Sequence, residues 1–148
     1  MIAVRVQAEP FDLAAEATAL TAGRTDIGAL VTFTGLVRDH GLSLEHYPGM
    51  TERQLCAVAD EACARWPVLA GTVVHRYGDL GPGDPIVFVA VAAAHRAAAF
   101  EAASFLMDWL KTRAPFWKRA GDEWVAANAS DDEAAARWGG LPGDREPG

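Results

Sequence analysis

The run from Pro85 to Ala94, PIVFVAVAAA, is almost wholly apolar and places the strongest constraint on the fold. It is too short to cross a membrane as a helix, which takes about 20 residues. Its isoleucine and valines favour a strand. A strand without polar positions is covered on both faces. The chain is therefore expected to pack helices around a sheet that contains this strand.

Further strands are predicted where apolar residues are β-branched or alternate with polar ones. These segments are residues 2–8, 28–37, 42–47, 71–77 and 123–125. The polar turn at 38–41 predicts that the strands on either side of it pair as a hairpin. Within the first of those two, Gly35 indicates a bulge or a close backbone approach.

Helices are predicted where a capping residue precedes apolar positions at helical spacing. Asp12 caps a helix over 13–21, and Thr51 with Gln54 forms a capping box for a helix that ends near Trp66. A third helix covers 96–114 and stops at Pro115, followed by a short aromatic and basic arm. The capping residues of a last short helix, which ends at Trp138, are Ser130 and Glu133.

This order of elements predicts an α+β fold, a mixed or antiparallel sheet covered by helices in a single domain. The domain is expected to span 1–138, and the Gly/Pro-rich end, 139–148, to be a flexible tail. The N-terminus lacks the pattern of a signal peptide, so a cytoplasmic location and no membrane partner are expected. No strand is followed by a Gly-rich nucleotide-binding loop.

Cysteines and histidines give no sign of a metal or redox centre. Cys56 and Cys63 are seven residues apart in a predicted helix, about 10 Å along its axis, which is too far for a disulfide. We expect both to be inert packing residues. The four histidines are not spaced as zinc ligands, so neither a metal nor a cofactor is predicted.

Positive charge is concentrated in residues 95–119 of an otherwise acidic chain. Five cations face two acids in this segment, a net charge of +3, so the remainder carries −10 of the total of −7. A cationic island of this kind favours a small anionic ligand or an anionic chain end over a polyanion. The cations are Arg96, Lys111, Arg113, Lys118 and Arg119.

Lys111 and Lys118 are the candidates for catalysis. Crowded cations beside Phe116 and Trp117 lower one another's proton affinity, which lets a lysine act as a base or nucleophile. The alternative is that both are solvated cations at a helix end. Arg38, which follows a strand, is likewise either a ligand contact or one half of a surface salt bridge.

His95 and Arg96 stand where the apolar strand becomes a helix, and helix-start amides bind anions. They are otherwise a plain surface pair. Fifteen helical steps separate Arg96 from Lys111 by about 22 Å, so one small ligand cannot be held by both from the same chain. If all are functional, a twofold partner completes the site with its own His95 and Arg96.

Five stretches, taken together, resemble the large, catalytic subunits of molybdopterin synthase. The resemblance runs in order over 28–119 and weakly on to Trp138; KTRAPFWK and HYPGMTE are its specific signals. The stretches are GALVTFTGLVRDH, LEHYPGMTE, HRYGDLGPGD, AAHRAAAFEA and LKTRAPFWKR.

The resemblance implies a hammerhead-like α+β fold and a sulfurtransferase of molybdenum cofactor biosynthesis. The substrate is cyclic pyranopterin monophosphate, a small anionic pterin, which receives two sulfurs to become molybdopterin. The donor is the C-terminal Gly-Gly thiocarboxylate of a small ubiquitin-like sulfur-carrier subunit. Two large subunits form a homodimer within a heterotetramer, with one small subunit at each end.

Lys111 and Lys118 match the two catalytic lysines of the family. By this resemblance, Lys111 acts as an acid/base or a transient nucleophile, and Lys118 orients the pterin or the thiocarboxylate. The two roles could also be exchanged between the lysines. The substrate-binding positions are Arg38 with the backbone at Leu36 and Val37, Arg119, Ala120, and, from the opposing subunit, His95 and Arg96.

The sequence departs from the family in four places. Some members carry a basic residue at Leu36, a serine at Ala93 and an acid at Ala120, and the turn between His40 and Leu44 is shorter than usual. Leu36 implies the loss of one phosphate contact, and Ala93 and Ala120 the loss of a helix cap and a charge pair. The short turn implies an altered flap over the pocket. Neither lysine is affected.

Two rival functions remain at the level of sequence. In the first, Phe116 and Trp117 stack on single-stranded nucleic acid, although the −10 elsewhere disfavours a polyanion and no nucleic-acid partner is expected. In the second, the chain is a non-catalytic adaptor that only receives the tail of the small subunit.

Overall fold

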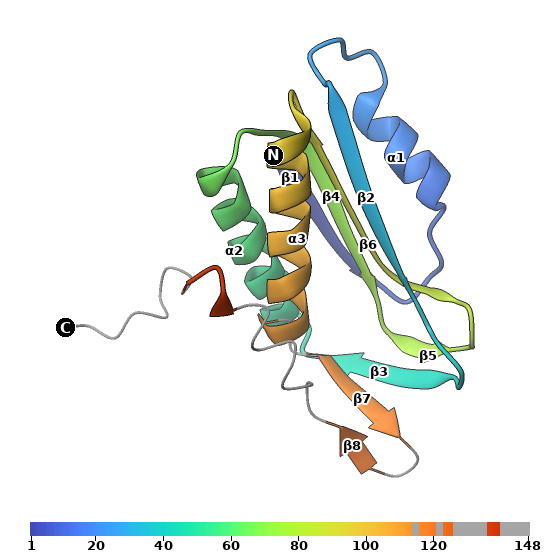
Figure 1. Cartoon of the computed structure of the whole chain (residues 1–148). Coiled ribbons are helices and arrows are strands. Elements are labelled where there is room, and N and C mark those ends of the chain that lie inside the picture. Colours follow the sequence, from blue (N-terminus) through green and yellow to red (C-terminus); the bar gives the residue numbers. More distant parts are fainter. Residues whose placement is uncertain (114–115, 121–122, 126–135, 140–148) are drawn as a thin grey trace, which may run out of the picture.

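The computed structural model describes residues 1–113, 116–120, 123–125 and 136–139. Within them lie two four-stranded sheets and three helices (Figure 1). The larger sheet is sandwiched between helices, and the smaller sheet lies at one end of it. This is the α+β architecture that the sequence predicted.

The larger sheet has the strand order β1-β4-β6-β2. Strands β1 and β4 are parallel, whereas β6 is antiparallel to both of its neighbours, so the sheet is mixed. Its strands are β1 (Ile2–Gln7), β2 (Ala29–Leu36), β4 (Val68–Arg76) and β6 (Pro85–Ala93). The predicted bulge in β2 is confirmed, because the register with β6 shifts after Gly35.

Strand β6 is buried on both faces, as its sequence requires. On one face Val87, Val89 and Val91 pack in the main core beneath α2 (Met50–Arg65) and α3 (Arg96–Arg113). On the other face Phe88 and Ala90 pack against residues of and before α1 (Leu13–Thr21). The strand is an inner strand of the sheet that separates the two groups of helices, and α3 is the next element along the chain.

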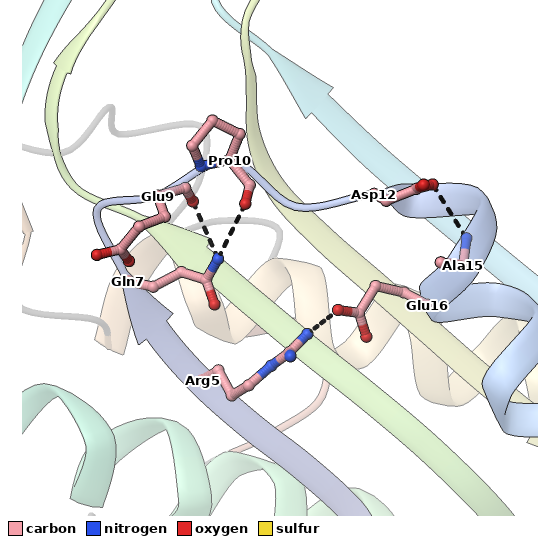
Figure 2. Close-up of polar contacts among 7 residues, drawn as sticks. All are labelled: Arg5, Gln7, Glu9, Pro10, Asp12, Ala15 and Glu16. Atoms are coloured by element: carbon pink, nitrogen blue, oxygen red, sulfur yellow. Dashed lines mark hydrogen bonds and ion pairs between the residues drawn. The ribbon is translucent and has the colours of Figure 1, made fainter.

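Polar contacts supplement the apolar packing of helix α1 on the sheet (Figure 2). Asp12 caps it, as predicted, by accepting a hydrogen bond of 3.1 Å from the backbone of Ala15. Arg5 of β1 forms an ion pair with Glu16 of α1. The amide of Gln7 donates to two backbone carbonyls in the connecting loop. These contacts fix the chain between β1 and α1.

The smaller sheet is antiparallel with the order β5-β3-β7-β8. Its strands are β3 (Leu42–His46), β5 (Gly78–Leu80), β7 (Phe116–Ala120) and β8 (Glu123–Val125). Val37, Leu44 and Leu80 form a small core of their own between this sheet and the larger one. The sheet therefore has the apolar support that holds β7 in place.

The predicted hairpin of residues 28–37 and 42–47 is wrong. Strand β2 pairs with β6 in the larger sheet, whereas β3 pairs with β5 and β7 in the smaller one. At the corner between them, the N–H of Val37 donates to the carbonyl of Asp84, and the carbonyl of Val37 accepts from Gly83. These bonds turn the chain from one sheet into the other.

The start of α2 also differs from the prediction. The Glu52 carboxylate, not Gln54, caps the helix by accepting from the N–H of Gly49 at 2.7 Å. Thr51 is fully buried, and its hydroxyl donates to the carbonyl of Tyr47 instead. The predicted end at Trp66 is confirmed.

Three further predictions concern the C-terminal third of the chain. The aromatic arm after α3 is strand β7, which was not predicted, while the edge strand at 123–125 is confirmed as β8. Residues 130–135 of the last expected helix, and all of the expected tail except Gly139, lie outside the described residues. No helix in the described part of the chain combines the length and apolar character needed to cross a membrane.

Candidate functional site

The two lysines of this chain are Lys111, in α3, and Lys118, in β7, and the end of α3 lies at the same end of the fold as β7 (Figure 1). Lys111 is exposed in the last turn of α3, where a cation is favoured by the helix dipole. Lys118 is the middle residue of β7, and its backbone pairs with Leu44 of β3 on one side and Val125 of β8 on the other. The two lysines are seven residues apart in the chain.

Arg119 and Ala120 follow Lys118 in β7. Arg119 pairs with Ser43 of β3, and Ala120 pairs with Glu123 of β8. The register fixes their backbone positions in the smaller sheet, beside that of Lys118.

The chain between β2 and β3 brings Arg38 to this end of the molecule. Leu36, the last residue of β2, is 58% exposed, whereas Val37 is buried and its backbone groups are bonded to 83–84. The Arg38 side chain is 91% exposed and lies 3.5 Å from Asp39. An ion pair so open to water is weak, so it leaves Arg38 available to an anion.

His95 and Arg96 lie at the opposite end of α3 from Lys111 (Figure 1). Both are exposed, and the first turn of α3 contains no acidic residue to offset the positive end of the helix dipole. Fifteen steps of helix put Arg96 about 22 Å from Lys111. One chain therefore carries the predicted site residues as two separate groups.

Acidic residues near these groups have partners of their own. Glu101 accepts from the Trp66 indole at 2.7 Å, and Asp108 accepts from Trp138 and Arg137. In the loop before β2, a hydrogen bond from Arg24 lowers the pKa of the Asp26 carboxyl. The carboxylates of Glu101, Asp108 and Asp26 are thus already bonded to other side chains.

The cysteines stand apart from both groups of site residues, on α2. Both are free thiols; Cys63 packs against the main core as expected, whereas Cys56 is exposed, so the packing role expected for it is wrong. Among the residues that the structure describes, no three His, Cys, Asp or Glu side chains are grouped to hold a metal ion.

The family model of the MoaE protein matches residues 6–113, from β1 to the end of α3. The chain belongs to the MoaE family of molybdopterin synthase catalytic subunits. It is 55% identical over 144 residues to a molybdopterin synthase catalytic subunit of Cereibacter sphaeroides, covering 91% of this chain and 99% of that protein. The recognition made from sequence motifs is thereby confirmed.

Solved structures of the MoaE family share the fold. A MoaE protein from Burkholderia ambifaria is 51% identical, with a TM-score of 0.86, and the match covers 94% of this chain and 99% of that one. A complex of subunits 1 and 2 of molybdopterin-converting factor from Helicobacter pylori matches with a TM-score of 0.67 at 21% identity, over 86% of this chain and 90% of that one. At that identity the likeness concerns the fold alone.

Sequence reasoning missed a set of rings beside β7. His46 of β3 and His75 of β4 lie against Phe116, the first residue of β7, and Tyr77, the residue after β4, lies against His46. The available signal is the HYPGMTE stretch, which begins with His46. The ring partners of His46 lie about 30 and 70 residues away, so no local pattern pointed to them.

Proposed function

We propose that this chain is the catalytic subunit that converts cyclic pyranopterin monophosphate to molybdopterin, in molybdenum cofactor biosynthesis. The sulfur comes from the thiocarboxylated Gly-Gly terminus of a small ubiquitin-like subunit. Each transfer forms one carbon–sulfur bond and breaks one carbon–oxygen bond on the pterin. Water then hydrolyses the resulting thioester, which leaves the sulfur on the pterin and a carboxylate on the donor. The observation that carries the proposal is that both lysines of a MoaE-family chain lie at one end, on α3 and β7.

The charges of the reactants explain why cations are needed there. The cyclic phosphate and the thiocarboxylate are both negative, and bringing them together in one site requires positive groups that offset their repulsion. We assign Lys111 the acid/base or transient nucleophile role and Lys118 the orientation of pterin or thiocarboxylate. Arg38 and Arg119, with the chain at Leu36, Val37 and Ala120, complete the substrate contacts.

A second copy of the chain supplies the remaining cations. Strand β2 is at the edge of its sheet and exposes Leu30, Phe33 and Leu36, and Phe100 of α3 is 61% exposed. Apolar side chains on a strand edge favour pairing with another copy. This surface supports a homodimer.

The direction of β2 supports a site shared between the two copies. Ala29, at its start, pairs with Ala93, two residues before His95, whereas Arg38 follows its end. If two β2 strands pair antiparallel about a twofold axis, the start of one lies beside the end of the other. His95 and Arg96 of the partner subunit then approach Arg38.

The small subunit is the second partner in this proposal. One small subunit bound at each outer end of the dimer gives a heterotetramer in the cytoplasm. Relatives at 55% identity are named catalytic subunits of molybdopterin synthase, a name that implies a further subunit in those enzymes and supports a partner of this class.

Reconstitution tests the proposal directly. The purified chain is mixed with a thiocarboxylated small subunit and the cyclic phosphate, and the dithiolene product is detected after oxidation to a fluorescent pterin. We expect product from the wild type and none from Lys111→Ala, although that variant still binds the small subunit. Product formation by Lys111→Ala at the wild-type rate supports a non-catalytic adaptor instead, and an intact complex without turnover rejects the proposal.

A further inference from the structure

Four aromatic side chains meet where α3 gives way to β7. The imidazole of His75 stacks on the ring of Phe116, with centroids 3.8 Å apart and planes 18° apart. The imidazole of His46 lies 5.8 Å from Phe116 and 4.4 Å from Tyr77. We call His46, His75, Tyr77 and Phe116 the ring cluster; it joins the larger sheet, through β4, to the smaller sheet.

Hydrogen bonds fix the orientation of both imidazoles. Nδ1 of His75 lies 2.8 Å from the carbonyl of Arg76, which can only accept, so this nitrogen donates. Nδ1 of His46 lies 3.1 Å from Oγ1 of Thr51, whose own hydrogen is donated to the carbonyl of Tyr47. Both rings are therefore protonated on Nδ1 and held by groups that do not belong to β7.

The ring cluster acts on the strand that carries Lys118. Phe116 opposes His46 in the register of β7 with β3, and Lys118 opposes Leu44 two residues on. A shift of the strand by one residue would exchange its two faces. Holding the Phe116 ring therefore fixes the register of β7, and with it the backbone of Lys118.

We propose that His46 and His75 are positioning residues for sulfur transfer, acting through Phe116 on Lys118, and that Thr51 holds His46. The role of Lys118 rests on the function proposed above. Histidine suits the task because one side chain both packs against a ring, stacked in His75 and tilted in His46, and donates a hydrogen bond. Phenylalanine would keep only the ring contact, and asparagine only the donor.

The first test separates positioning from support of the fold. Thr51→Val keeps the shape of a fully buried side chain and removes the acceptor for His46, whereas Thr51→Ser keeps the acceptor. We expect kcat to fall about tenfold to a hundredfold in Thr51→Val and His46→Phe, the loss typical of a catalytic group displaced by about 1 Å. KM, small-subunit binding and the folded fraction stay at wild-type values, and Thr51→Ser restores most of kcat.

A matched control removes a threonine hydroxyl with the same backbone hydrogen bond from a helix far from Lys118 in the chain. Thr18 of α1 donates its hydroxyl to the carbonyl of Ala14 at 2.8 Å, the same four-residue bond that Thr51 makes to Tyr47. Thr18→Val should leave kcat unchanged. Wild-type kcat in Thr51→Val, or a loss of activity that only follows the unfolded fraction, would overturn the proposal. If Thr51→Val does not fold, Phe116→Leu, which keeps apolar bulk without the stack, carries the same test.

The second test does not depend on the reaction. Because the chain has two lysines, reductive methylation with ¹³C-formaldehyde labels two side chains and the N-terminus. The Lys118 resonance, assigned by loss in Lys118→Arg, should shift in His46→Phe and Thr51→Val and keep its position in Thr51→Ser. An unchanged Lys118 resonance rejects positioning, whatever the wild type does with the pterin. Absence of turnover in the wild type, with a shifted resonance, rejects only the proposed function.

Discussion

A mixture of two inactive variants should regain activity if the site is shared between two chains. Helix α3 separates Arg96 from Lys111 by about 22 Å, so the proposed dimer draws these groups into each site from different chains. Arg96→Ala and Lys111→Ala each damage both sites of their own homodimer. In a hybrid dimer, both lesions fall in one site and the other site is intact.

The size of the recovery follows from counting sites. Random association of equal amounts gives about half hybrids, and each hybrid has one working site of two, so the mixture should show about one quarter of wild-type activity. Hybrids isolated through two different affinity tags should show about half. The assay is conversion of the cyclic phosphate with excess thiocarboxylated small subunit, after coexpression of the two chains.

A control pair identifies the geometry. Lys111 and Lys118 lie at the same end of one chain, so a hybrid of Lys111→Ala with Lys118→Ala has one lysine missing from each site and should stay inactive. If the Arg96 and Lys111 hybrid is as inactive as this control, the cations of α3 are not shared across the dimer. Full activity of the Arg96→Ala homodimer would refute the assignment of Arg96 itself.

Three other perturbations test the packing around the site. Trp138→Ala removes an indole whose N–H donates to Asp108 at 2.6 Å and should cost about 2–4 kcal/mol in urea unfolding, of which Trp138→Phe recovers part. Gly28→Ala puts a Cβ 2.2 Å from the carbonyl oxygen of Ala94 and should lower stability by about 1–3 kcal/mol, seen as a lower Tm. Phe33→Asp places a charge on the exposed edge of β2 and should yield monomers in light scattering, whereas an unchanged dimer mass would exclude this edge as the interface.

Sequence patterns predicted elements well where the signal is local. The run at 85–94 could only be a doubly covered strand, and Asp12 could be recognised as a cap from its place before a short helical pattern. The long helix of 96–113 ends within one residue of its expected end, because Pro115 forbids continuation. These features depend on neighbours within a few residues.

Strand partners could not be predicted in the same way. A four-residue polar turn favours a hairpin, but the chain at Val37 bonds to residues 83–84, nearly 50 residues later, and leaves the sheet. Strand β7 lacks polar and apolar alternation and exists because β3 and β8 pair with it. The prediction that Thr51 caps α2 failed for a different reason: its hydroxyl donates back to the carbonyl of Tyr47 and lies 3.1 Å from His46, the last residue of β3.

The two ends of α3 have opposite electrostatic characters, and the proposed dimer uses both. The amide end favours anions and is flanked by His95 and Arg96, whereas the carbonyl end favours cations and carries Lys111. Antiparallel pairing of β2 about a twofold axis sets the amide end of one α3 toward the carbonyl end of the other. Each site then receives an anion-binding group from one chain and a lysine from its partner, which is how an acidic protein can gather enough positive charge for two anionic reactants.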